Sequence, residues 1–364
     1  MIEARDNHST HFDETNFQIA MRHFTWVISI FSIIATALPF IQSPFWLIRI
    51  FDFPRLQIAV VCLISIILCL IYIKQKKVYQ TLLLSLLAIA FSYQASKIIV
   101  YTPLHPLQVK NSNYEKASDS FSLMIANIIM TNQKTEAFKK QVYEYNPDIL
   151  VITEPNARWE LKLRELDNTF PYSIKYPLEN TYGMIVYSKL PLKNKKINFL
   201  ADRDVPSFYA SVRLPSGKSF DLYSIHPKPP RPGINSYKWD AEVLITGKKI
   251  REHNRPALVA GDLNDVGWSR TTKRFQEYSR LGDPRQGRGL FSTYNAQIPL
   301  FRYPLDHIFF SESFGLIKIA KLDNAGSDHF AMYIKLSFER YPDKIKNLGD
   351  PDKEDKKIIK EKIK

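Results

Sequence analysis

Three long stretches without a charged residue occupy the first part of the chain. They cover residues 24–48, 56–73 and 78–96, and charged residues lie only between them. A helix needs roughly 20 apolar residues to cross a bilayer, whereas a soluble amphipathic helix keeps a polar stripe. The pattern therefore predicts a polar N-terminal leader at residues 1–23 and a three-span transmembrane region at residues 24–101. A cleaved signal peptide is the alternative, but two more apolar stretches follow the first.

The remainder of the chain has a different pattern. Residues 102–120 are polar and contain Pro103 and Pro106, which indicates a linker. Residues 342–364 alternate acidic and basic side chains without apolar periodicity, which is typical of a solvated charged tail. Residues 121–341 lie between them and have the size of one globular domain.

Within residues 121–341, short β-branched runs end in polar residues. Runs of this kind predict buried strands. The four runs and the residues that follow them are 121–126 with Asn127, 148–153 with Glu154, 220–225 with His226, and 256–261 with Asp262 and Asn264.

Two further runs begin with polar residues instead. Asp306 and His307 open the run 308–310, and Asp328 and His329 open the run 330–336. In a mixed sheet, the start of an antiparallel strand lies at the same edge as the carboxyl end of its neighbour. One edge can therefore collect all of these side chains. A helix is expected at residues 133–145, between the first two strands.

The side chains expected at this edge suit a hard cation and a phosphate ester. Carboxylates, carboxamides and imidazoles are present, but no thiolate, because Cys62 and Cys69 both lie in the second apolar stretch and are expected to act there as small apolar residues. Oxygen ligands favour Mg²⁺, or Mn²⁺, over a cysteine-ligated zinc ion. Hydrolysis of a phosphate ester by water needs a cation, a carboxylate for the water and donors for the developing charge.

These motifs, in this order and at about this spacing, resemble the endonuclease/exonuclease/phosphatase superfamily, the deoxyribonuclease-I-like hydrolases. The resemblance covers nearly all of residues 121–341, and the apolar leader resembles that of bacterial membrane proteins that carry this domain. It implies an α/β fold, a four-layer α/β/β/α sandwich preceded here by three transmembrane helices.

The resemblance also implies roles for individual residues. Glu154 is similar to the metal ligand, with Asn127 as a ligand or a phosphate-positioning neighbour, and Asp328 within reach of the metal. Asp262 resembles the residue that orients the attacking water, and Asn264 the one that holds the phosphate. His329 is similar to the histidine that acts on the phosphate, Asp306 to the carboxylate that orients it, and His226 to a donor for a non-bridging oxygen.

The substrate stays open at this point. The first 110 residues hold nine of the 50 Lys and Arg and five of the 36 Asp and Glu, so the rest of the chain is clearly basic. Lys228 and Arg231 can bind a polyanion such as nucleic acid, or equally an anionic phospholipid headgroup. The excess of cations can also serve solubility alone. We therefore retain a nuclease-like phosphodiesterase, a phospholipid-headgroup or phosphomonoester hydrolase, and a catalytically silent binding module.

The orientation in the membrane follows from the basic residues between the stretches. Lys74, Lys76 and Lys77 form the densest group and are expected in the cytoplasm, together with Arg5 and Arg22. Arg49 and Arg55 weaken this inference. Three crossings from that side predict a multi-pass protein of a bacterial inner membrane, with the catalytic domain in the periplasm or outside the cell.

Three other features are expected to be structural. Residues 282–289 are glycine-rich but lack the Lys and Ser or Thr of a phosphate loop, which predicts an exposed turn. His307 alternates with Asp306 along a strand and is expected to pack in the core. Tyr182 is expected to be a core aromatic.

Overall fold

A computed structural model of the chain describes residues 15–73, 77–112, 116–339, 345, 348–349, 356–357 and 360–361. Arg5, Lys74, Lys76 and most of the predicted leader and tail lie outside these residues. The described residues form two compact units. The helical unit comes from Met1–Ile41 and Arg55–Ser96, and the sandwich unit from Gln42–Pro54 and Lys97–Lys364.

The helical unit contains three helices that are long and apolar enough to cross a membrane. They are α1 (Asn16–Ala37), α3 (Arg55–Tyr72) and α4 (Lys77–Ile98). The sequence predicted a start at residue 24, but α1 begins earlier, because Thr15 forms a capping box with Gln18. The end of the first span also differs: a short helix, η1 (Leu38–Phe40), follows α1, and Pro39 lies within it.

Small polar side chains line one face of α1. Thr25, Ser29, Ser32 and Thr36 are all buried, as are Cys62 and Cys69 of α3, which are both free thiols. Residues spaced by three and four lie on one side of a helix, and small ones allow close packing in an apolar environment. The expectation that both cysteines pack as small apolar residues is thus confirmed.

The sandwich unit contains two mixed β-sheets. The first has the strand order β10-β11-β1-β2-β4-β3, and the second has the order β5-β6-β7-β8-β9. The strands of the first sheet are β1 (Ser120–Asn127), β2 (Ile149–Thr153), β3 (Tyr172–Tyr176), β4 (Met184–Ser188), β10 (Phe314–Lys321) and β11 (Met332–Phe338). Those of the second are β5 (Leu192–Asn198), β6 (Ser207–Arg213), β7 (Ser219–Ser224), β8 (Ala257–Asp262) and β9 (Asp306–Phe310).

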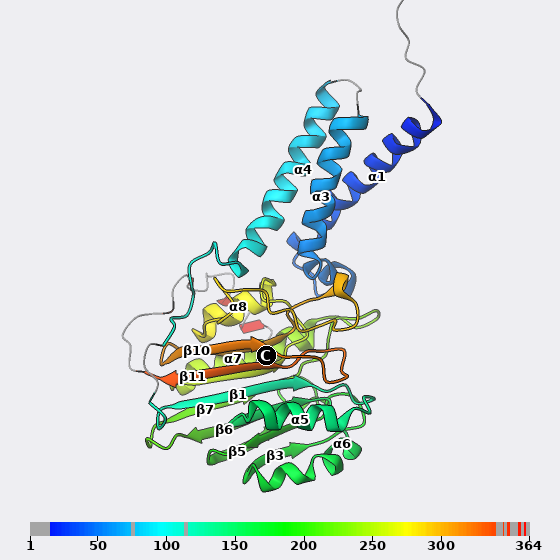
Figure 1. Ribbon diagram of the computed structural model, residues 1–364. Helices are drawn as coiled ribbons and strands as arrows, with labels where there is room; N and C mark the ends of the chain where they lie inside the picture. Colours follow the sequence, from blue (N-terminus) through cyan, green and yellow to red (C-terminus); the bar gives the residue numbers. More distant parts are fainter. Residues whose placement is uncertain are drawn as a thin grey trace, which may run out of the picture. The chain divides into compact units, whose positions relative to one another are not determined.

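Three apolar clusters define four layers. The central cluster joins side chains from the facing sides of both sheets, such as Phe121 and Phe220, whose rings stack at 4.6 Å. A second cluster packs α5 (Thr135–Tyr145) and α6 (Ala157–Lys162) on the first sheet, and a third packs α7 (Tyr237–His253) and α8 (Arg270–Ser279) on the second (Figure 1). The predicted α/β/β/α sandwich is therefore confirmed, including the helix between β1 and β2. Three single turns complete the unit: η3 (Ile99–Tyr101), η4 (Arg164–Asn168) and η5 (Pro299–Phe301).

Strand directions bring the polar ends to one edge. In the first sheet β1 runs parallel to β2 and antiparallel to β11. In the second sheet β7 runs parallel to β8, and β8 runs antiparallel to β9. The carboxyl ends of β1, β2, β7 and β8 therefore lie level with the starts of β9 and β11, as the sequence predicted.

The segment between α1 and α3 belongs to the sandwich unit. It contains α2 (Trp46–Arg49) and η2 (Ile50–Asp52). Arg49 is buried, and its guanidinium lies 3.2 Å from Asp52, 3.7 Å from Asp240 and 3.9 Å from Asp265. It also lies over the ring of Trp239. Arg49, which entered the sequence analysis only through the membrane orientation, thus neutralises buried carboxylates of the fold.

The predicted linker is also packed. Gln108 and Val109 are buried, and the Gln108 side-chain oxygen accepts a hydrogen bond of 2.6 Å from the backbone of Asp283. Val109 joins the central apolar cluster. Residues 101–112 are therefore part of the sandwich unit rather than a free connector.

Substitution of Arg49 by Ala tests this packing. Removing one partner of a buried charge group leaves the other charges uncompensated, which costs about 3 kcal/mol. We expect the melting temperature of the full chain in detergent to fall by several degrees, whereas Arg203→Ala, at an exposed position, should leave it within about a degree. Equal melting temperatures for the two variants would show that Arg49 does not stabilise the sandwich unit.

Glu242 on α7 predicts a pH-dependent stability. Burial raises the pKa of Glu242 to about 8, and its Oε1 atom has no hydrogen-bond partner. A raised carboxyl pKa contributes stability that is complete below the unfolded value of about 4.3 and is lost as pH rises through about 8. The glutamine of Glu242→Gln stays neutral at every pH. The melting temperature of this variant minus that of the wild type should therefore increase between pH 5 and pH 9, and the underlying difference in the free energy of unfolding should be a few kcal/mol at most. The exposed Glu252→Gln on the same helix should show no such trend, and parallel curves for both variants would contradict the expectation.

Candidate active site

Seven side chains meet where the two sheets end. Asn127 ends β1, Asp262 ends β8, and Asp306 opens β9. The others lie in the loops beside these strand ends. The complete set consists of Asn127, Glu154, His226, Asp262, Asn264, Asp306 and His329, joined by the contacts described below.

The amide of Asn127 connects carboxylates of the two sheets. Its Nδ2 atom donates to Glu154 Oε1 at 2.9 Å and to Asp262 Oδ2 at 2.9 Å. Its oxygen accepts from the backbone N–H of Ile129 at 3.0 Å, which fixes the orientation of the amide. In this arrangement Asn127 holds the two acids in place, and its oxygen faces away from them.

Asp306 and His329 form a close pair that also crosses between the sheets. His329 Nδ1 lies 2.8 Å from Asp306 Oδ2, and His329 Nε2 lies 3.6 Å from Asp262 Oδ2. Burial opposes a charge on His329, but Asp306 and Asp262 raise its pKa above the usual value. The imidazole is therefore in its charged form near neutral pH and can donate from both nitrogens.

His226 has the opposite character. Its Nε2 atom lies 4.0 Å from Glu154 Oε1 and 3.8 Å from Asp262 Oδ2. Burial, together with the charge of His329, lowers the pKa of His226 to about 3, so this imidazole is neutral. The two histidines thus differ in charge although both contact Asp262.

The donor set fits a divalent cation. Glu154, Asp262 and Asp306 bring three carboxyl groups together with one charged imidazole, and burial raises the pKa of both Glu154 and Asp262. One ligand atom each from Asp262, Asp306 and His329 also lies within 4.8 Å of the others. A charged imidazole carries protons on both nitrogens and cannot ligate a metal. The carboxylates of the group, rather than His329, are therefore the better ligands.

The backbone is left-handed at two of these positions. Glu154 has φ +67° and Asn264 has φ +52°. Asparagine tolerates this region, whereas glutamate seldom adopts it, so the strain lies at Glu154. Such conformations persist where the surrounding structure holds them, and they are frequent at functional sites. Glu154 is held by its N–H, which donates to the carbonyl of Gly183 at 3.0 Å.

Close backbone approach explains the glycine before Asp262. A Cβ atom on Gly261 would lie 1.9 Å from the carbonyl oxygen of Ile225, on the neighbouring strand end. Only glycine allows β8 to approach this closely to the residue before His226. Asn264 completes the turn: its N–H donates to Asp262 Oδ1 at 2.8 Å, and its side chain donates to the carbonyl of Pro227 at 3.0 Å.

The remaining predicted residues lie near the group without joining its hydrogen bonds. Asp328 is close enough to raise the pKa of Glu154. Lys228 pairs with Asp202 at 3.0 Å and lies over the ring of Tyr182. Arg231 is exposed, and its charge lowers the pKa of Tyr182, although burial raises that pKa overall. Tyr182 is buried, as predicted for a core aromatic, but its ring also contacts His226 at 5.5 Å.

The expected exposed turn at residues 282–289 was wrong. Asp283 and Arg285 are fully buried and form an ion pair at 2.8 Å. Arg285 also donates to the carbonyl of Asp306 and to Nδ1 of His307, whose Nε2 donates to the carbonyl of Asp265. His307 is thus a buried core histidine, as predicted. Arg285 stabilises the start of β9 through its hydrogen bonds to Asp306 and His307. No local sequence signal predicts this burial, because an arginine in a glycine-rich segment is usually exposed.

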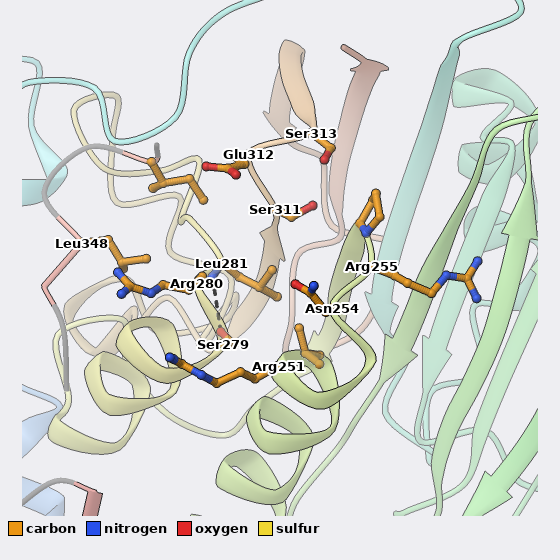
Figure 2. Close-up of a pocket in the computed structure, with 13 residues that line it drawn as sticks. Arg251, Asn254, Arg255, Ser279, Arg280, Leu281, Ser311, Glu312, Ser313 and Leu348 are labelled. Carbon is orange, nitrogen blue, oxygen red and sulfur yellow. Dashed lines mark hydrogen bonds between the residues drawn. The ribbon is translucent and has the colours of Figure 1, made fainter. Parts of the chain in front are cut away.

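A cavity of about 450 Å³ lies elsewhere in the sandwich unit. It is bordered by the ends of α7 and α8, and Arg251, Arg255 and Arg280 are among the residues that line it (Figure 2). Arg255 is paired with Asp221, and Arg251 donates to the carbonyl of Tyr278. None of the seven converging side chains lines this cavity, so its chemistry differs from that of the strand-end group.

The chain belongs to the Endonuclease/Exonuclease/phosphatase family, whose model matches residues 130–329. The family joins nucleases and phosphatases, which hydrolyse phosphate esters. This membership agrees with the sandwich fold and with the acidic, metal-compatible group at its edge. A comparison with the curated proteins found no match.

Solved structures share the fold at low sequence identity. The TDP2 structure from D. rerio in complex with a single-strand DNA product is 15% identical, with a TM-score of 0.51, and the match covers 60% of this chain and 99% of that one. The human Nocturnin catalytic domain with bound sulfate is 17% identical, with a TM-score of 0.51, over 62% and 96%. A family protein from Bacteroides thetaiotaomicron is 16% identical, with a TM-score of 0.50, over 60% and 95%.

Proposed function

We propose that this chain is a membrane-anchored, divalent-metal-dependent hydrolase that cleaves phosphodiester bonds by attack of water. The observation that carries the proposal is the joining of Glu154, Asp262 and the Asp306–His329 pair at one edge of the sandwich. A catalytically silent binding module would have no need for one neutral and one charged histidine around a shared carboxylate.

In this proposal Glu154 holds Mg²⁺ or Mn²⁺, with Asp328 beside it and Asn127 fixing the carboxylate. A cation held there would supply positive charge for the non-bridging oxygens of the phosphate. Asp262 orients the water and accepts its proton, a task that the burial of this carboxyl favours. Asn264 and His226 position the phosphate oxygens. His329, kept charged by Asp306, stabilises the developing charge and returns a proton to the leaving oxygen.

The location proposed is a bacterial inner membrane, with the sandwich unit outside the cytoplasm. The three apolar helices support membrane association. With two spans between them, residue 54 and residue 101 lie on the same side of the bilayer. The packing of Gln42–Pro54 within the sandwich unit agrees with that arrangement.

Substitution and chelation test the chemistry in the full chain. Asp262→Asn removes the base and should lower the rate of phosphodiester hydrolysis at least about a hundredfold, while Asp204→Asn, at an exposed position, should change it less than twofold. Excess chelator should abolish turnover in the wild type, and added Mg²⁺ or Mn²⁺ should restore it. Undiminished hydrolysis in chelator would contradict the metal assignment, and an active Asp262→Asn variant would contradict the role of that residue.

Reporter fusions test the location. Alkaline phosphatase, active only outside the cytoplasm, should be active when fused after residue 364, and green fluorescent protein at the same position should stay dark. A fusion after residue 75 should give the reverse result, because that loop is expected in the cytoplasm. Fluorescence of the C-terminal fusion would overturn the orientation.

A further inference from the structure

We infer that the substrate is a phospholipid of the membrane in which the chain is anchored, cleaved at the phosphodiester of its headgroup. This inference rests on the proposed function and adds the substrate class. It is carried by the positions, within the sandwich unit, of the residues that adjoin the apolar helices.

The covalent chain determines which part of the sandwich unit lies next to the bilayer. Gln42 and Pro54 belong to this unit, but their sequence neighbours Ile41 and Arg55 belong to the helical unit. Consecutive Cα atoms are about 3.8 Å apart, so residues 42 and 54 lie at the boundary of the first two spans. Lys97 stands in the same relation to the third span.

Contacts within the sandwich unit connect these boundary residues to the catalytic group, by which we mean the seven side chains at the strand ends. The ring of Phe53 contacts the ring of Tyr303 at 5.8 Å. Tyr303 pairs through its backbone with Tyr294, and the ring of Tyr294 lies 5.0 Å from that of His329. Two aromatic ring contacts, joined by one backbone pairing, therefore connect the residue next to Pro54 to His329.

A second connection reaches the loop after Asp262. The indole N–H of Trp268 donates to the carbonyl of Asp52 at 2.7 Å. Arg49 contacts Asp265, the residue after Asn264. Both sides of the catalytic group are thus tied to the segment Gln42–Pro54, whose two ends continue directly into the first two apolar helices.

Exposed apolar side chains adjoin the same region. Just before Arg302, Ile298, Leu300 and Phe301 are 48%, 66% and 48% exposed. Phe45, Leu47 and Ile50 of the segment Gln42–Pro54 are each nearly half exposed. Apolar groups beside cations are typical of surfaces that enter the boundary between headgroups and acyl chains. Nucleic acid is a poorer fit, since its backbone is bound mainly through polar and cationic groups.

Two cations flank the residue after His329. Arg302 and Lys321 lie over the ring of Phe330, at 5.0 and 4.5 Å from its centroid. Desolvation lowers the pKa of Lys321, and the nearby charge of Arg302 lowers it further. An anionic headgroup phosphate bound beside these two side chains would relieve their mutual repulsion.

The reaction balances as a hydrolysis. The oxygen of water bonds to phosphorus, and the P–O bond to one of the two alcohols breaks. One proton of the water ends on the released alcohol and the other on the phosphomonoester product. No oxidant, reductant or further co-substrate is required.

Purified full chain, reconstituted with Mg²⁺ in vesicles of phosphatidylcholine and phosphatidylglycerol, tests the inference. The parallel substrates are plasmid, single-stranded oligonucleotide, and soluble bis(4-nitrophenyl) phosphate. We expect lipid products by mass spectrometry that Asp262→Asn abolishes. Leu300→Ser should lower the ratio of vesicle to soluble-diester turnover about tenfold, whereas Leu161→Ser, on α6 and also more than half exposed, should not change it.

The outcomes separate the two proposals. Cleavage of nucleic acid or the soluble diester without lipid products overturns the lipid inference and leaves the proposed function standing. If Leu300→Ser leaves the ratio of vesicle to soluble-diester turnover unchanged, the exposed apolar side chains around Leu300 do not help to bind lipid. This result also contradicts the inference. Absence of cleavage of every substrate overturns both proposals.

Discussion

The hydrogen bonds of Asn127 to Glu154 and Asp262 are the interaction on which the rest of the site depends. They bring together one carboxylate from each sheet in a place where both are largely shielded from water. Carboxylates repel one another at such distances unless donors or cations lie between them. The amide supplies the donor, and the Asp306–His329 pair supplies one positive charge. A cation at Glu154 would complete the balance, and the edge of the sandwich is therefore suited to bind a phosphate ester.

Much of this edge could be predicted from the sequence. Buried strands are short and β-branched, so their ends can be located, and the polar residues at those ends then follow from strand direction. Asn127, Glu154, His226, Asp262, Asp306 and His329 were all found this way. These residues could be predicted because each belongs to a local pattern, in which a polar residue directly follows or precedes a run of apolar residues.

The supporting contacts could not be predicted, because they join residues far apart in the sequence. Arg49 comes close to Asp240 and Asp265 only in the folded chain. Arg285 can be buried because it pairs with Asp283 and donates a hydrogen bond to His307. Gln108 was placed in a linker because its neighbours are polar and rich in proline, yet it caps the backbone of Asp283. A polar residue is predicted to be exposed unless its partner lies nearby in the sequence, so buried ion pairs and buried amides between distant residues cannot be predicted from local patterns.

The inclusion of Gln42–Pro54 in the sandwich unit has a consequence for biosynthesis. This segment leaves the ribosome long before its partners, and the hydrogen bond between Asp52 and Trp268 joins residues 216 positions apart. Arg49 therefore cannot pair with Asp240 and Asp265 until the second half of the chain has been translated. The sandwich unit can therefore become complete only after α3 and α4, which lie between this segment and the rest of the unit, have been synthesised.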